Sequence, residues 1–299
     1  MNTQPTTAST TTSIHPDTHI GVVSLTVADL NRSIEFYEQI LGFRTINRTD
    51  NSAELGAEST TPFLLLTEIP GAPPKPIRAT GLYHFAILVP SRADLGRSLK
   101  HLAESGYPLD GYADHLVSEA LYLSDPDRNG IEIYRDRSRE EWQWQDGHVV
   151  MASELPDLRG ILAEGESDPR PWTGLSAGTG IGHMHLQIGD VRQAADFYHN
   201  VLGFDIVAAM PSALFVSAGG YHHHIGLNTW NSLRGVPAPA GSAGLRHFAL
   251  VFKDSDARQQ VLARLEAAKI PFETEGEVVT VNDPWSNVIH LAIEPGQAS

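Results

Sequence analysis

Apolar residues gather in short runs along this 299-residue chain, and four of the runs have the length and composition of β-strands that open a structural unit. These predicted strands are Val22–Val27, His84–Val89, His183–Ile188 and His247–Phe252. A helix is expected after each; over Leu30–Ile40, apolar side chains recur at the spacing of one helical face. The strands predicted to close the units are Phe63–Thr67, Gly130–Tyr134, Tyr221–Asn228 and Val288–Ile293. The pattern predicts four modules, each made of a strand, a helix and three more strands.

The predicted modules carry similar sequence segments, which occur in the same order in both halves of the chain. The matching segments are SLTVADL at 24–30 and HLQIGDV at 185–191, FYEQILGF at 36–43 and FYHNVLGF at 197–204, GLYHFAILV at 81–89 and GLRHFALVF at 244–252, and DPDRNGIEI at 125–133 and DPWSNVIHL at 283–291. The four pairs occur in the same order, and the members of each pair are separated by nearly the same number of residues. This indicates that the chain consists of two copies of one half-length unit.

The modules group into two expected domains. The first spans 19–135, with modules at 19–70 and 80–135, and the second spans 181–295, with modules at 181–230 and 244–295. The Thr- and Ser-rich stretch at 1–18 has the composition of a flexible leader. Residues 136–180 combine prolines and glycines with acidic runs and little periodicity, which predicts a linker.

Charge and composition narrow the classes of function. The chain carries 21 basic and 36 acidic residues, a net charge of −15, which argues against nucleic acid or an anionic membrane surface as a partner. No apolar run approaches the roughly 18 residues of a membrane span, and the N-terminus lacks the basic and apolar regions of a secretory signal. Cysteine is absent, so disulfides and thiolate chemistry are excluded. These features favour a cytoplasmic protein whose metal ligands, if any, are nitrogen and oxygen.

Histidines recur at one position of the opening strands. The equivalent positions hold Val22, His84, His183 and His247, and the polar residues near the ends of the closing strands are Glu132, His223 and His290. Two histidines and one carboxylate are the ligands of non-haem iron(II) oxygenases, and His84, Glu132 and His183 supply that set. The rival set of His183, His247 and His290 would be a three-histidine site, which is closer to zinc chemistry.

Four segments, GHMHLQIGD, FYHNVLGF, LYHFAILV and DPDRNGIEIY, resemble the vicinal oxygen chelate superfamily. Within it, the chain is similar to the two-domain catechol 2,3-dioxygenases over about 19–293. The resemblance implies an α+β fold in which four βαβββ modules pair into two open, cup-shaped barrels of mixed β-sheet. These segments do not define the activity, because glyoxalases, epimerases and antibiotic-binding proteins of the superfamily share them.

The resemblance to extradiol dioxygenases also implies catalytic residues beside the metal. His223 in YHHHIGLN, His115 in ADHLVSEALYL and Tyr122, ten positions before Glu132, match the family's pattern. The two histidines are expected to titrate near neutrality and to transfer protons, and the tyrosine to donate a hydrogen bond to a catechol oxygen. On strand alternation, at least one of His222 and His224 should face away from the metal, and both are expected to have packing or supporting roles.

All of these residues lie in the second and third modules, although the better-known two-domain members use the third and fourth. We therefore expect the second module to pair with the third and the first with the fourth. Pairing of the first with the second, and of the third with the fourth, is the alternative.

The resulting hypothesis is an extradiol dioxygenase that opens a catechol-type ring next to its hydroxyls with O2. The expected metal is Fe(II), with Mn(II) as the alternative, and the expected partner is a small aromatic diol; assembly into a homo-oligomer stays open. Another metal-dependent enzyme of the superfamily, of glyoxalase or isomerase type, would need a second glutamate. A small-molecule-binding resistance protein would need no metal ligands at all.

Overall fold

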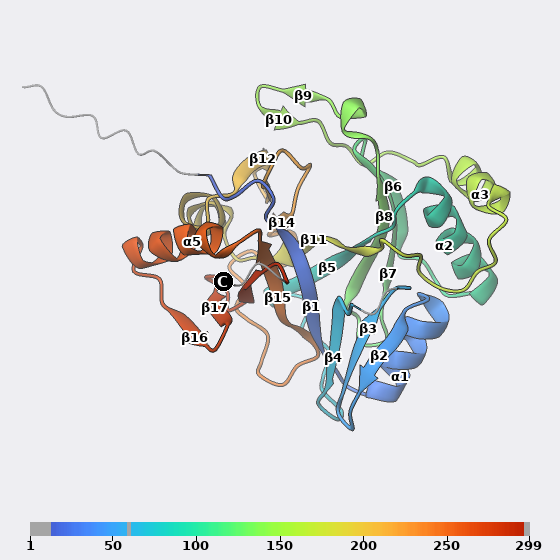
Figure 1. The fold of residues 1–299 in the computed structure, drawn as a ribbon, viewed down its shortest axis with the longest axis horizontal. Coiled ribbons are helices and arrows are strands. Elements are labelled where there is room, and N and C mark those ends of the chain that lie inside the picture. The colour runs from blue at the N-terminus through green and yellow to red at the C-terminus, as the bar shows by residue number, and fades with distance from the viewer. Residues whose placement is uncertain (1–12, 59–60, 296–299) are drawn as a thin grey trace, which may run out of the picture.

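The computed structural model describes residues 13–58 and 61–295, and most of its strands form two eight-stranded sheets (Figure 1). The first sheet contains β1 (His19–Val27), β2 (Arg44–Arg48), β3 (Ser52–Gly56), β4 (Leu64–Glu68), β15 (Gly244–Phe252), β16 (Phe272–Glu275), β17 (Val278–Asn282) and β18 (Val288–Ile293). The second contains β5 (Gly81–Leu88), β6 (Gly111–Asp114), β7 (Ser118–Ser124), β8 (Gly130–Asp136), β11 (Gly180–Gln187), β12 (Asp205–Met210), β13 (Ala213–Ser217) and β14 (Ile225–Asn228).

Each sheet is built from two modules that lie far apart in the sequence. The order of the first sheet is β16-β17-β18-β15-β1-β4-β3-β2, and that of the second is β12-β13-β14-β11-β5-β8-β7-β6. The opening strands meet in antiparallel pairs, β1 with β15 and β5 with β11, whereas each closing strand lies parallel to its own opening strand. The predicted fold class is confirmed, and the second module pairs with the third as expected. The domain boundaries at 19–135 and 181–295 stay a prediction.

A helix follows each opening strand, as the pattern predicts. These helices are α1 (Leu30–Glu35), continued by the π-helical turn η1 (Phe36–Ile40); α2 (Arg92–Ser105); α4 (Val191–Ala194), continued by the π-helical turn η3 (Ala195–Val201); and α5 (Ser255–Ala267). Each begins at an N-cap whose side-chain oxygen accepts a backbone N–H of the first turn, namely Asp29, Ser91, Asp190 and Asp254. The chain leaves η1 and η3 through Gly42 and Gly203, whose φ angles are 81° and 90°.

The repeated FY and DP segments join the two modules of each half. The hydroxyl of the buried Tyr37 donates to Asp125 at 2.9 Å, and that of Tyr198 donates to Asp283 at the same distance. Each tyrosine lies on the helical segment of one module, and its aspartate lies in the loop before the closing strand of the next. The duplicated sequence therefore repeats a tertiary contact as well as the secondary structure.

The segment predicted as a linker has a structure of its own. It forms the short helix η2 (Arg139–Glu141), a hairpin of β9 (Trp144–Gln145) and β10 (His148–Val149), and the helix α3 (Leu158–Ser167). Of its tryptophans, Trp142 is buried and Trp172 stacks on His101 with ring centroids 4.5 Å apart, whereas Trp144 is exposed. The segment thus follows the surface of the second sheet as an ordered layer.

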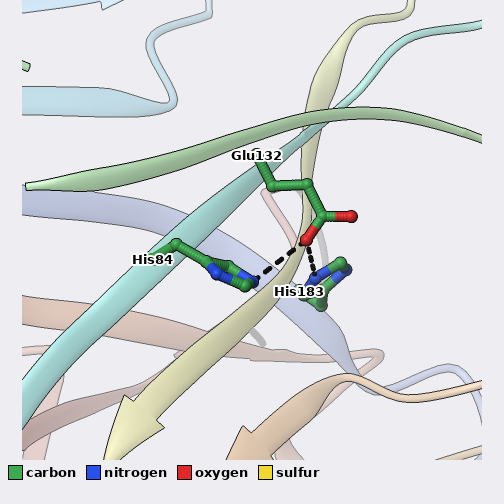
Figure 2. Close-up of side chains that lie close together, drawn as sticks. All are labelled: His84, Glu132 and His183. Carbon is green, nitrogen blue, oxygen red and sulfur yellow. Dashed lines mark hydrogen bonds and ion pairs between the residues drawn. The ribbon is translucent and has the colours of Figure 1, made fainter. Parts of the chain in front are cut away.

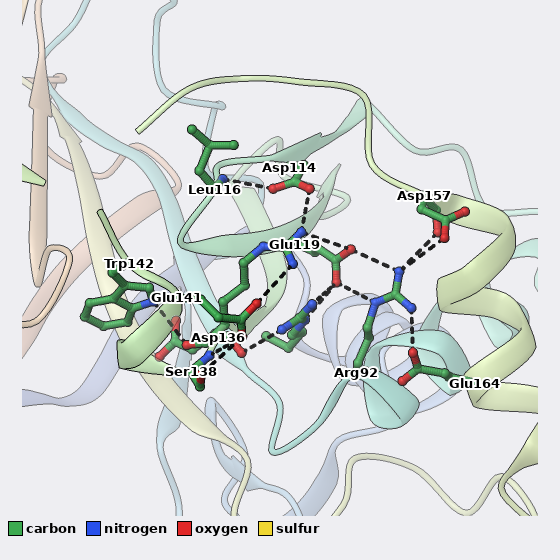
Figure 3. Close-up of polar contacts among 12 residues, drawn as sticks. Arg92, Asp114, Leu116, Glu119, Asp136, Ser138, Glu141, Trp142, Asp157 and Glu164 are labelled. Carbon is green, nitrogen blue, oxygen red and sulfur yellow. Dashed lines mark hydrogen bonds and ion pairs between the residues drawn. The ribbon is translucent and has the colours of Figure 1, made fainter. Parts of the chain in front are cut away.

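Helix α3 lies directly against α2 (Figure 1). The two cross at glycines: a Cβ on Gly165 would lie 2.3 Å from the carbonyl carbon of Gly96, so neither position has room for a side chain. Beside this contact, the guanidinium of Arg92 in α2 donates to Glu164 of α3 and to Glu119 of β7, at 2.6 and 2.7 Å (Figure 3). Close backbone packing and these ion pairs fix α3 to the outer side of the sheet.

The expected leader is in part packed against the fold. Ile14 is buried and its backbone N–H donates to the carbonyl of Gly203 at 2.7 Å. Residues 13–18 therefore differ from the loose stretch expected there, and residues 1–12 lie outside the described residues. Within the described part of the chain, every helix is too short or too polar to cross a membrane.

Candidate metal centre

The three predicted ligands meet on adjacent strands of the second sheet. His84 lies on β5, Glu132 on β8 and His183 on β11, and β5 is the central strand of the three. Both histidines direct Nε2 toward the same carboxylate oxygen, Oε2 of Glu132, at 3.0 Å from His84 and 3.1 Å from His183 (Figure 2). All three side chains are buried. The structure thus brings together the residues that strand register predicts.

The protonation states of these groups suit a cation. Burial by itself raises the pKa of Glu132, but His183 and His84 outweigh it and hold the pKa well below its usual range. Burial lowers the pKa of His183 by more than the Glu132 carboxylate raises it. The site therefore offers an ionised carboxylate and a neutral imidazole, which are the forms that bind metals.

An orphaned nitrogen at the cluster also fits a metal site. Among the described residues, His84 Nε2 and His183 Nδ1 are buried without a hydrogen-bond partner of good geometry. Buried polar atoms in this condition are rare in folded proteins, because leaving water without a new partner costs about 1–3 kcal/mol. A cation between His84, Glu132 and His183 would satisfy the His84 nitrogen, and this is the one cluster of metal-ligating side chains found in the described residues.

The rival three-histidine set is wrong. His247 and His290 lie on β15 and β18 of the first sheet and stack on each other, with ring centroids 3.9 Å apart and planes 17° apart. His183 belongs to the other sheet, so the three side chains do not converge. Burial lowers the pKa of His247 to about 4, so this pair is neutral near pH 7 and packs as two flat rings.

Two of the predicted catalytic residues, His115 and Tyr122, form a pair beside the metal cluster. Tyr122 lies directly across from Glu132 in the β7–β8 ladder, and its ring centroid is 5.6 Å from that of His84. His115 Nε2 is 2.7 Å from the Tyr122 hydroxyl, and its Nδ1 is 2.6 Å from the carbonyl oxygen of Ala152. Because a carbonyl only accepts, His115 Nδ1 carries the hydrogen, and Nε2 of the neutral ring accepts from the tyrosine.

The third predicted catalytic residue, His223, contacts His183 with ring centroids 4.2 Å apart. It precedes β14 instead of lying on it, so strand alternation does not apply to His222 and His224. The expectation that at least one of these two faces away from the metal stays a prediction. His222 is fully buried and its Nδ1 lies 2.8 Å from Nδ1 of His223. The expectation that His223 titrates near neutrality is also wrong, because burial lowers its pKa well below the usual range.

Sequence reasoning missed His185, which lies two positions after His183 and so on the same face of β11. Its ring is 4.9 Å from that of His84, and its Nε2 accepts a hydrogen bond from Asn228 Nδ2 at 3.0 Å. Tyr83 and Trp230 lie against it, at 5.1 and 5.4 Å between ring centroids. The alternation of β11 could have placed His185 here, whereas only the fold brings the two aromatic residues beside it.

A cavity of about 490 Å³ lies elsewhere, where the loops between the modules of each half meet. His247 lines it, together with Lys75, Arg246 and residues 237–245, and the three ligand candidates do not. Cavity size alone therefore does not mark the metal centre.

The comparisons with known proteins agree with this fold. The sequence profile of the Glyoxalase/Bleomycin resistance protein/Dioxygenase superfamily matches residues 19–133 and 180–291. The chain therefore belongs to this superfamily. It is 47% identical, over 92% of its own length and 97% of the relative's, to Catechol-2,3-dioxygenase from Bacillus subtilis (strain 168). Identity at this level over nearly both full chains supports a dioxygenase enzyme.

Solved structures show the same fold at low sequence identity. A putative dioxygenase from Bacillus subtilis has a TM-score of 0.61 and 16% identity, with 95% of this chain and 87% of that chain covered. Glyoxalase I from Zea mays has a TM-score of 0.56 and 16% identity, with 92% of each chain covered. These structures support the architecture and leave the reaction to the site residues.

Proposed function

We propose that this protein is an extradiol dioxygenase, which opens a catechol-type ring beside its hydroxyls with O2 at an iron(II) centre. The observation that carries the proposal is the buried cluster of His84, Glu132 and His183, with Tyr122 and His223 beside it. Two imidazoles and one carboxylate leave the remaining coordination positions of a metal open, which suits reactions that take two substrates. Fe(II) is the proposed metal, and Mn(II) is the alternative.

Bound in this cluster, iron(II) would supply a Lewis acid and a one-electron donor for the reaction between catechol and dioxygen. The chain's own residues then have separate tasks. His223 accepts and returns a proton, because its Nε2 has no protein partner among the described residues. From the sequence, Tyr122 is expected to donate to a catechol oxygen, but its hydroxyl hydrogen is directed to His115 Nε2, so it offers its oxygen to a catechol hydroxyl instead.

An aromatic substrate is consistent with the side chains around the cluster. Tyr83, His185 and Trp230 contact one another edge to face, and His185 also contacts His84. Aromatic side chains in this arrangement favour an aromatic substrate, because aromatic rings pack well edge to face. The proposed partner is therefore a small aromatic diol. A cytoplasmic location and assembly into a homo-oligomer stay expectations from the sequence.

A glyoxalase- or isomerase-type activity is the second candidate, and the donor set disfavours it. Such an enzyme needs a second glutamate beside the metal. In the described part of the chain, the metal-ligating cluster has the single carboxylate of Glu132. A metal-free binding protein is disfavoured as well, because it would leave the orphaned Nε2 of His84 unexplained.

Replacement of one histidine tests the proposal, and the duplicated chain provides its own control. We expect His84→Ala to lower iron affinity by roughly a hundredfold or more, since loss of a residue that only supports a ligand already costs about 10–100-fold. Ring opening should be lost with the iron. His247→Ala changes the equivalent position of the other sheet, where the side chain stacks on His290, and should keep both.

The measurement is iron content of anaerobically purified protein, together with the absorbance of the ring-opened product of catechol. If His84→Ala keeps wild-type iron and turnover, the cluster is not the metal site. Wild-type protein that binds iron yet leaves catechol intact would contradict the proposed reaction.

A further inference from the structure

Asp136, the last residue of β8, lies at one end of a chain of hydrogen bonds that leads toward the metal cluster. Glu132 and Asp136 are four residues apart on one strand, so alternation places both carboxylates on the same face of the sheet. His222 lies between this aspartate and His223. Its Nε2 is 2.8 Å from Asp136 Oδ1, and its Nδ1 is 2.8 Å from His223 Nδ1. A continuous chain of hydrogen bonds thus connects Asp136 to the histidine that touches His183.

The aspartate is itself fixed in place. The hydroxyl of Tyr221 donates to both of its oxygens, at 3.2 and 2.9 Å, and lies 2.7 Å from the hydroxyl of Tyr134. Trp142 covers His222, with ring centroids 5.3 Å apart. His222 is fully buried, whereas the Asp136 side chain is about a quarter exposed. A partly exposed carboxylate held by the Tyr221 hydroxyl is well placed to orient the buried ring.

The hydrogen bonds permit one arrangement of protons when both rings are neutral. A carboxylate only accepts, so His222 Nε2 carries the hydrogen of that ring, and His222 Nδ1 has none. The contact between the two Nδ1 atoms needs one donor, which must then be His223. A neutral His223 with its hydrogen on Nδ1 has an unprotonated Nε2. That nitrogen has no protein partner in the described part of the chain.

We propose that Asp136 and His222 are positioning residues that hold His223 in the tautomer whose Nε2 is free to accept a proton from the bound substrate. This inference rests on the proposed function, because it names the support for the proton acceptor of that reaction. Without the aspartate, His222 could place its hydrogen on either nitrogen, and His223 would follow. The ring would then present an N–H to the substrate in part of the molecules, and those molecules could not accept the proton.

Asp136→Asn tests the inference, because it keeps the shape of the side chain but can both donate and accept. We expect kcat to fall about tenfold or more, up to the roughly hundredfold to ten-thousandfold that general-base catalysis contributes, while the KM for catechol and the iron content stay unchanged. Asp136→Glu, which restores a pure acceptor, should recover part of the lost kcat. Asp146→Asn makes the same chemical change on the outer hairpin, at a residue with φ 52°, and should leave kcat unchanged.

The tautomer of His223 can be measured without measuring catalysis. Long-range ¹H–¹⁵N spectra of the full-length protein, loaded with Zn(II) as a diamagnetic substitute, should show the Nε2 of His223 unprotonated in the wild type. The Asp136→Asn variant should show a mixture. Unchanged kcat with an unchanged spectrum would overturn the inference, and so would loss of iron, which would make Asp136 part of the metal site. If wild-type protein does not open catechol, the proposed function fails, while the spectra still decide the role of Asp136.

Discussion

The histidines around the metal cluster differ in how their second ring nitrogen is used. His115 and His223 each have one nitrogen held from outside, by the Ala152 carbonyl and by His222, and the other turned toward Tyr122 or left free. Among the described residues, His183 has no such support at Nδ1. The protein therefore fixes the ring orientations of His115 and His223 through a hydrogen bond at one ring nitrogen, whereas His183 has no such hydrogen bond at Nδ1 among the described residues.

Replacing His223 separates catalysis from metal binding. Because His223 contacts His183 without belonging to the ligand cluster, His223→Phe should keep iron and still bind catechol. Loss of a general acid or base typically costs about a hundredfold to ten-thousandfold in rate, so kcat under saturating oxygen should fall within that range. Iron content and steady-state turnover are measured on the same sample. A variant without iron would make His223 a ligand, and one with full turnover would remove it from the reaction.

The metal ligands could be predicted because they lie on regular strands. The supporting roles of His222 and Asp136 could not, because strand register does not describe their contacts. His84, His183 and Glu132 lie on regular strands, where side chains alternate and each residue's position fixes its direction. His222 lies in an irregular stretch before β14, so no periodicity described its direction. The contacts of Asp136 with His222 and Tyr221 join residues more than 80 positions apart, and strand periodicity carries no information on such pairs.

At the scale of elements, the segment 136–180 contributes more to the site than a linker would. It supplies Asp136, which contacts His222, and the Ala152 carbonyl that orients His115, while Trp142 packs on His222. Its helix α3 has the sequence LRGILAEGES, in which Leu158, Ile161 and Leu162 have the spacing of one helical face. A helix of ten residues with two glycines is marginal by itself, so its packing on α2 contributes to its stability.

The glycine contact between α2 and α3 gives a direct test of that packing. A Cβ on Gly165 would meet backbone atoms of α2 at 2.3 Å, so Gly165→Ala should push the helices apart and destabilise the protein by about 1–3 kcal/mol. Gly111→Ala is the matched control, because nothing lies within 4 Å of its added Cβ, and should stay within about 0.5 kcal/mol of wild type. Urea unfolding measures both. Equal stability of the two variants would mean that α3 does not rest on α2 in this way.

At the scale of the whole molecule, the two halves of the chain are interleaved. Each sheet takes one module from each half, joined by the antiparallel pairs β1–β15 and β5–β11. His84 and Glu132 come from the first half and His183 from the second. The sequence could predict this pairing because its ligand candidates occur in the second and third modules. It could not predict that residues 13–18 pack against the second half, since that contact has no repeated motif.

Interleaving predicts how the protein should respond to being divided. A cut after Gly178, in the loop before β11, leaves β1 and β5 each with one unpaired edge in the first piece, and β11 and β15 each with one unpaired edge in the second. Open central strands expose backbone donors and acceptors and apolar side chains, so neither piece should exist as a folded monomer. Mixing the pieces during refolding should restore both sheets, the iron site and ring opening.

The control is the intact chain with a protease site inserted after Gly178 and cleaved only after folding, which isolates the effect of the break itself. That protein should stay assembled and active, because the strand pairs and the metal cluster are already formed across the halves. Circular dichroism, gel filtration and iron content compare the separate, mixed and cleaved forms. A first piece that is monomeric, unfolds cooperatively and binds iron at wild-type stoichiometry would contradict the interleaved fold, because that piece lacks His183 and the strand that pairs with β5.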